Sequence, residues 1–123
     1  KEMPNVKAVS FNFHTPYPDT RALLLSKEEK KNVCNTLAQM MDEGAPVLNL
    51  KSAFPYLINN SFTTPCHQSL IIENGNISVC GRCIDEPGLC DECGYFFAAE
   101  YTLLFKGNLK ITFEALRTYM KYL

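Results

Sequence analysis

The sequence lacks long apolar runs and a strong charge of either sign. No run approaches the roughly 18 consecutive apolar residues that a transmembrane helix needs, and no signal peptide is visible. The net charge is −1, with both signs spread along the chain, which predicts neither a basic nucleic-acid surface nor a membrane-binding face. A Gly-rich phosphate loop, an internal repeat and a low-complexity linker are missing as well. We therefore expect neither nucleic acid nor a membrane among the partners.

What the chain does have is a composition typical of a globular protein. Of its 123 residues 46% are hydrophobic and 11% are aromatic, which excludes a disordered chain. Its clustered charges also have an ordinary interpretation. Lys27, Lys30 and Lys31 alternate with Glu28 and Glu29, and this pattern predicts a solvated helix face rather than a binding patch.

The cysteines form the most informative pattern. Four of the six occur as two C-x-x-C pairs in the string CGRCIDEPGLCDEC. Two intervening residues bring both sulfurs of a pair to one centre, and two pairs complete a tetrahedron of thiolates. Pro87-Gly88 lets the six-residue spacer turn the second pair onto the first. Four thiolates suit Zn²⁺ or an iron–sulfur cluster. The predicted ligands are Cys80, Cys83, Cys90 and Cys93.

The other two cysteines are less constrained. Cys66 precedes a predicted hairpin that returns the chain near Cys80, so Cys66 is either an alternative or additional ligand or an unliganded thiol. Its neighbour His67 is more typical of a solvent-facing histidine than of a ligand. Cys34 lies beside an apolar helix face and is predicted to be a small core residue. A secreted disulfide framework fits poorly because cysteines three apart rarely pair, so we expect a cytoplasmic protein.

The first half of the chain predicts a strand, a helix and a second strand. Residues 6–13 and the buried run 46–50 are rich in strand formers. Between them, Ser26 and Glu29 form a capping box that opens a helix, and Gly44 ends it. Strand, helix and strand make a β-α-β unit, which favours a parallel sheet. The apolar helix face is predicted to consist of Val33, Leu37, Met40 and Met41.

The second half predicts a hairpin, a cysteine-rich loop and two helices. Asn74-Gly75 is a strong two-residue turn signal, and it sets Ile72 opposite Ile77 within residues 69–80. Helices are expected over 95–106 and from a Thr112 cap onward. In the last helix, Phe113, Leu116 and Met120 recur on one face, which predicts an apolar face there. The fold class predicted from the whole chain is therefore α+β.

Two segments resemble parts of the radical SAM superfamily. FNFHTPYPDTRALLLSKEEKKNV followed by EGAPVLNL is similar to the last strand–helix–strand part of such an enzyme's barrel. The pattern Cys66-x8-Gly75-x4-Cys80, followed by the remaining three cysteines, resembles the C-terminal extensions of the SPASM or Twitch type. The resemblance covers most of the chain. It implies that residues 1–62 are a β-α-β remnant of a parallel partial barrel and that residues 63–123 are a metal-binding hairpin with a helical extension.

The resemblance also implies a function. Such extensions hold auxiliary [4Fe–4S] clusters that bind substrate or pass electrons, and Zn²⁺ can take the same thiolates in an isolated fragment. The C-x3-C-x2-C motif of the SAM-cleaving cluster is absent, so this chain alone is expected not to cleave SAM. The chain starts at Lys1, and an upstream barrel of the same polypeptide is the expected partner. Apolar edges left open by the missing barrel predict a homodimer or rearranged packing.

Two questions stay open at this point. His14 follows a predicted strand, where α/β folds place ligand-binding loops, so it is a candidate substrate-binding residue. A structural role is the other interpretation, because the histidine stands alone in a proline-rich loop. The competing function for the whole chain is a structural zinc-binding module that binds a protein partner.

Overall fold

The computed structural model describes residues 6–63, 70–79 and 86–122, and within them helices predominate. Short 3₁₀ turns connect or precede the α-helices at Pro18–Leu23 (η1), Lys51–Ala53 (η2) and Leu89–Glu92 (η4). The strands β1 (Leu70–Glu73) and β2 (Asn76–Val79) form one hairpin. The α-helices are Lys27–Asp42 (α1), Phe54–Ile58 (α2), Phe96–Phe105 (α3) and Leu109–Tyr122 (α4).

The predicted fold class, an α+β remnant of a parallel barrel, is wrong. The segments 6–13 and 46–50 are extended, but they share only one parallel bridge, between Val9 and Val47. Beyond this bridge, the side chain of Asn49 bonds to the backbone of the other segment in place of further strand-to-strand hydrogen bonds. Asn49 accepts the N–H of Phe11 through Oδ1 at 2.7 Å and donates from Nδ2 to the Phe11 carbonyl at 3.1 Å. Because this buried amide satisfies the backbone of Phe11, the two segments do not continue as a sheet.

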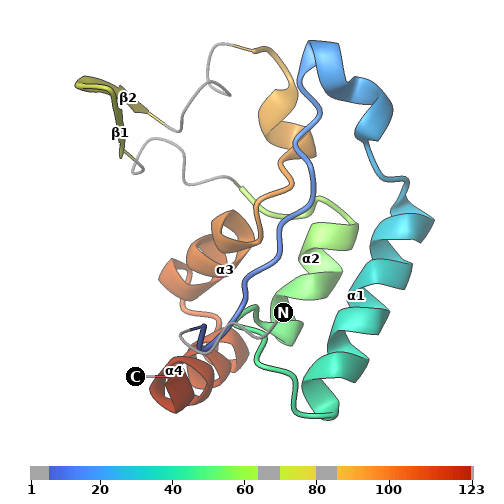
Figure 1. The fold of residues 1–123 in the computed structure, drawn as a ribbon, viewed down its shortest axis with the longest axis vertical. Coiled ribbons are helices and arrows are strands. Elements are labelled where there is room, and N and C mark those ends of the chain that lie inside the picture. The colour runs from blue at the N-terminus through green and yellow to red at the C-terminus, as the bar shows by residue number, and fades with distance from the viewer. Residues whose placement is uncertain (1–5, 64–69, 80–85, 123) are drawn as a thin grey trace.

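The hydrophobic core lies between the extended segment and the four α-helices. Its centre is the fully buried Phe96 of α3, whose ring makes edge contacts with Phe13 and Phe54 at centroid distances of 4.8 and 5.8 Å. Figure 1 shows the extended segment running through the middle of the molecule, with α3 and α4 to one side and α2 and α1 to the other. The core therefore joins residues from both halves of the chain. The division near residue 62 stays a prediction, since the following residues 64–69 lie outside the described ranges.

Helix α1 begins as predicted but buries a different face. Ser26 Oγ accepts the Glu29 N–H at 3.3 Å, and the Glu29 carboxylate accepts the Ser26 N–H at 2.8 Å, which confirms the capping box. The buried face is shifted by about one position from the predicted one, because Val33 and Met40 are each 38% exposed. The buried residues of α1 are Lys30, Cys34 and Leu37. The prediction of a solvated Lys30 is therefore wrong.

The hairpin is confirmed, including its register. Leu70 pairs with Val79 and Ile72 with Ile77, and Asn74 and Gly75 have φ angles of 50° and 80°, as a tight two-residue turn requires. Its apolar face is not covered within the described residues. Leu70, Ile72 and Ile77 are 70%, 73% and 69% exposed. Figure 1 shows the hairpin standing away from the helices.

The two C-terminal helices are present, but α4 starts and packs differently from the prediction. Its cap is Asn108, whose Oδ1 accepts the N–H of Ile111 at 3.2 Å, whereas Thr112 lies in the first turn and donates to the Asn108 carbonyl at 3.0 Å. Helix α4 buries Ile111 and Ala115. The predicted face of Phe113, Leu116 and Met120 is exposed instead. Together with the exposed Leu109 it is called the α4 apolar face below.

Helix α3 also carries an exposed row of aromatic side chains. Phe97, Tyr101 and Phe105 recur every fourth residue, and their rings contact one another at centroid distances of 6.4 and 6.0 Å. We refer to these three residues as the α3 aromatic row. None of the helices in the described ranges combines the length and the apolar character that a membrane span requires.

Candidate metal centre

The structure describes half of the predicted four-cysteine site. Cys90 lies within η4 and Cys93 directly follows it. The other predicted ligands, Cys80 and Cys83, and the alternative ligand Cys66 with its neighbour His67 lie outside the described residues. Within the described ranges alone, no group of three Cys, His, Asp or Glu side chains could hold a metal ion. The four-thiolate site therefore stays a prediction. The structure adds the geometry of its second pair.

The second cysteine pair is held on a tight turn. Gly88 has a φ of 79°, and the Asp91 N–H donates to its carbonyl at 3.2 Å. One turn further, the Cys93 N–H donates to the Cys90 carbonyl at 3.3 Å. Cys90 lies inside this 3₁₀ turn, and Cys93 is the residue that ends it, one turn further along. Cys93 is buried and Cys90 is half-buried, an arrangement that fits two sulfur ligands of one metal.

Gly94 fixes this turn against the extended segment near the N-terminus. Phe13 donates its N–H to the Gly94 carbonyl at 2.9 Å, and the Gly94 N–H donates to Thr15 Oγ1 at 3.2 Å in a buried position. A Cβ atom on Gly94 would lie 2.4 Å from the Phe13 carbonyl oxygen and 2.9 Å from that of His14. Any residue other than glycine at position 94 would therefore clash with this backbone. Sequence reasoning missed this contact, although a glycine directly after the last cysteine was the available signal.

The backbone of His14 lies close to Gly94, next to the second cysteine pair, while its ring contacts a residue in the following turn. The ring is half-buried, and Nε2 lies 2.8 Å from Thr20 Oγ1. That hydroxyl belongs to η1, which follows the loop. The structure thus brings His14 close to the cysteine turn, as a site would require, and also gives the ring a structural partner. A substrate-binding role for His14 stays a prediction.

An open cavity separates η1 from the cysteine turn. It has a volume of about 580 Å³ and lies between residues 16–21 and 86–92. An ion pair spans the two segments, with Arg21 Nη2 at 2.9 Å from Glu92 Oε1. Most of the Arg21 side chain remains exposed. The cavity is lined by residues on both sides of Cys90, and Arg21 also lines it, within reach of a molecule bound there.

Lys30 is a residue of this region that the sequence did not reveal. It is only 5% exposed, and its ammonium donates to Asn60 Oδ1 at 3.1 Å and lies 5.9 Å from the centre of the Phe13 ring. Burial lowers the pKa of Lys30 from its ordinary value, while Glu92, Cys34 and Cys93 act to raise it. Its position four residues before Cys34, on the buried side of α1, was the signal that sequence reasoning overlooked.

Cys34 is a core residue, as predicted. It is 2% exposed, and burial raises the pKa of its thiol to about 11 although the Lys30 ammonium acts to lower it. The thiol therefore stays protonated at neutral pH. A protonated thiol in an apolar core is inert, since the thiolate is the form that binds metal.

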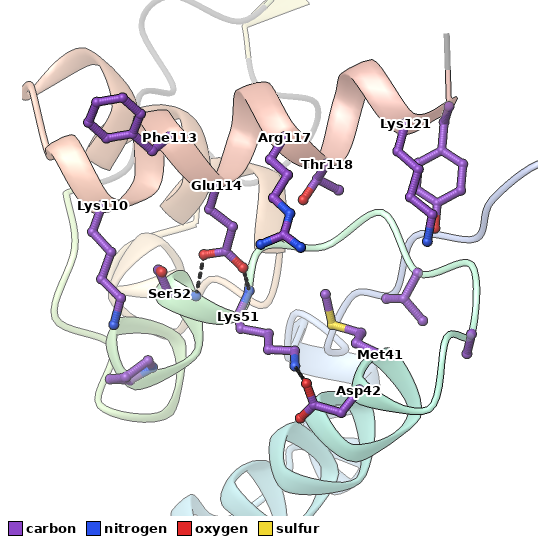
Figure 2. Close-up of a pocket in the computed structure, with 14 residues that line it drawn as sticks. Met41, Asp42, Lys51, Ser52, Lys110, Phe113, Glu114, Arg117, Thr118 and Lys121 are labelled. Carbon is purple, nitrogen blue, oxygen red and sulfur yellow. Dashed lines mark hydrogen bonds and ion pairs between the residues drawn. The ribbon is translucent and has the colours of Figure 1, made fainter.

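A second hollow lies at the other end of the molecule and contains none of the predicted site residues. It has a volume of about 700 Å³ and is lined by α4, the end of α1 and η2. Figure 2 shows Glu114 reaching from α4 to the N–H groups of Lys51 and Ser52, at 2.8 and 2.9 Å, and Lys51 reaching to Asp42. These carboxylates hold η2 in place. The basic side chains on its α4 side are Lys110, Arg117 and Lys121.

Comparison with known proteins adds no relative. A scan against protein-family models, a search of curated proteins and a search of solved structures each find no match to this chain. The radical SAM resemblance therefore remains an interpretation of the sequence.

Proposed function

We propose that this chain is the C-terminal, auxiliary-cluster part of a radical SAM enzyme. In this proposal Cys80, Cys83, Cys90 and Cys93 hold an iron–sulfur cluster, with Cys66 as an alternative or additional ligand. SAM cleavage would belong to an upstream barrel of the same polypeptide, because the C-x3-C-x2-C motif is absent here. When bound, the cluster would pass electrons or bind substrate directly.

One observation supports this proposal most strongly. The turn that carries Cys90 and Cys93 packs through Gly94 onto the segment that contains His14. The two segments whose sequences resemble the superfamily are therefore in direct contact, although about 80 residues separate them along the chain.

The chain's own residues would perform three tasks. The η4 turn presents two sulfurs to one centre, and the bond between Cys93 N–H and the Cys90 carbonyl keeps their spacing. Gly94 and Thr15 hold that turn against the core. The cavity between η1 and the turn offers a substrate space, with the exposed Arg21 at its edge able to bind an anionic group.

The exposed apolar surfaces favour a second candidate, a structural zinc module that binds a protein. The α3 aromatic row, the α4 apolar face and the apolar hairpin face are all uncovered within the described residues. Large apolar patches on a protein surface mark interaction sites. In this reading four thiolates hold Zn²⁺ only to stabilise the loop, and the exposed faces bind a partner or a second copy of the chain.

Metal analysis of freshly purified protein separates the two functions. Protein made and purified without oxygen should contain iron and acid-labile sulfide, with broad visible absorption, if the auxiliary-cluster proposal is correct. Zinc in a one-to-one ratio and no colour would favour the structural module. Protein that contains neither iron nor zinc, whether it is purified with or without oxygen, would overturn both candidates.

A further inference from the structure

A cavity of about 340 Å³ opens beside the α3 aromatic row, and none of the predicted metal ligands lines it. Helix α3, helix α4 and both extended segments contribute to its wall. The extended segments are held together there, because the Leu48 N–H donates to the Val9 carbonyl at 2.9 Å. The residues that line the cavity are Ser10, Leu48, Phe97, Glu100, Tyr101 and Tyr119.

Aromatic rings make up much of this wall. The rings of Phe97 and Tyr101 meet nearly at right angles, with an interplanar angle of 79° and a centroid distance of 6.4 Å, so they form a corner. Both side chains are partly exposed, which leaves the corner open to solvent. Tyr119 adds a ring from α4, and burial raises the pKa of its phenol to about 12, with nearby Glu100 adding to the rise. The phenol therefore stays neutral, and the rings together present an uncharged wall.

Glu100 is the acidic group of this cavity. Its side chain is 6% exposed, and Oε1 accepts the Leu50 N–H at 2.9 Å. None of the ion pairs among the described residues includes Glu100. Burial raises its pKa, and the charged neighbour that adds to this rise is the Glu114 carboxylate, which has the same sign. Since a buried carboxylate is costly without an opposite charge, a cation is the ligand that this cavity would stabilise most.

We propose that the cavity binds a methylated ammonium group, which packs against its aromatic rings and is balanced by the Glu100 carboxylate. Ring faces attract cations, and quaternary ammonium groups are the ligands that several rings recognise best. A metal ion fits poorly, because Ca²⁺ and Mg²⁺ require several oxygen ligands and the described lining offers one carboxylate. A primary ammonium needs acceptors for its three N–H groups, whereas a quaternary ammonium needs none. The proposal is independent of the metal site, since no predicted cysteine ligand lines this cavity.

Ligand titrations of the full chain, followed by amide NMR shifts, test the chemistry of this site. The probes are choline, ethanolamine and neohexyl alcohol, in which an uncharged tert-butyl group replaces the trimethylammonium of choline. We expect saturable binding of choline, with the alcohol weaker by roughly tenfold or more because it has the same shape but no charge. Ethanolamine should also bind more weakly than choline. A peptide that carries trimethyllysine distinguishes the source of the group: tighter binding of the peptide than of choline indicates a methylated protein, and the reverse indicates a small molecule.

Variants of the aromatic row connect the binding to this cavity. Tyr101→Leu removes a ring at an exposed position, and Phe105→Leu is the matched control, because Phe105 belongs to the same row but does not line the cavity. We expect Tyr101→Leu to weaken choline binding by roughly tenfold and Phe105→Leu to leave it unchanged. Glu100→Gln removes the charge but can still accept the Leu50 N–H, and it should weaken binding as well. If Glu100→Gln does not fold, the comparison of Tyr101→Leu with Phe105→Leu decides.

Several results would overturn the proposal. They are equal affinity for choline and neohexyl alcohol, equal affinity for choline and ethanolamine, and equal effects of Tyr101→Leu and Phe105→Leu. Absence of saturable binding with both choline and the trimethyllysine peptide would overturn it too. Metal content measured on the same samples keeps this test separate from that of the proposed function, because Tyr101→Leu should retain as much metal as the unmodified chain.

Discussion

Gly94→Ala should separate the cysteine turn from the rest of the protein. The added Cβ would lie 2.4 and 2.7 Å from the Phe13 carbonyl oxygen and carbon, distances that no rotamer change can relieve because all atoms involved are backbone. Relief requires the two segments to move apart, which breaks the Phe13–Gly94 and Gly94–Thr15 hydrogen bonds. Overpacking together with two lost buried bonds should lower the free energy of unfolding by about 2–4 kcal/mol.

Denaturant unfolding and zinc competition on the same samples measure both consequences. Gly107→Ala is the matched control, because Gly107 has a φ of 73° but open space around it, so its cost of about 1–2 kcal/mol is conformational only. We expect Gly94→Ala to weaken zinc binding and Gly107→Ala to leave it intact. The reasoning is refuted if Gly94→Ala is the less damaging of the two, or if its metal affinity equals that of the unmodified chain.

Two other predictions follow from local chemistry. Ser26→Ala removes the helix cap and should lower the free energy of unfolding by about 1 kcal/mol without changing metal content, and an unchanged denaturant midpoint would contradict the cap. Glu100 is buried, which raises its pKa above 4.5 although the Leu50 N–H donates to it at 2.9 Å. The folded state therefore holds this proton more tightly than the unfolded chain, so stability should fall as pH rises from about 4.5 through the raised pKa. Glu100→Gln should remove that part of the pH dependence, and an identical slope in both proteins would show that another group causes it.

The parts of the fold that the sequence predicts correctly are set by neighbouring residues. Asn74-Gly75 specifies its turn and, through the two-residue loop, the register of the hairpin. The Ser26–Glu29 box likewise depends on side chains three residues apart. Such signals are complete within a short stretch of chain, and tertiary packing did not override them.

The errors concern choices that distant residues decide. The parallel pairing of 6–13 with 46–50 stops at one bridge because the Asn49 side chain takes over the backbone of Phe11, and a strand pattern does not reveal such a replacement. Helix α4 has two apolar faces, and Ile111 and Ala115 are buried where periodicity favoured the bulkier face with Phe113.

The ligands of the candidate site are still a prediction from the sequence, and their surroundings are what the fold adds. C-x-x-C spacing identifies sulfur pairs from the sequence alone. The contact of Gly94 with Phe13 and the burial of Lys30 arise from packing between α1, the extended segment and the cysteine turn. A lysine among other charged residues has the pattern of a solvated face, and only the tertiary fold shows which one is enclosed.

The most direct test of the account is the metal content per chain of two cysteine variants purified side by side with the unmodified protein. Cys90→Ser removes a predicted ligand on η4, and Cys34→Ser removes a buried core thiol on α1. We predict that Cys90→Ser loses bound metal, whether iron or zinc, while Cys34→Ser retains it. Full metal content in Cys90→Ser, or loss of metal in Cys34→Ser from a folded chain, would contradict the four-thiolate site.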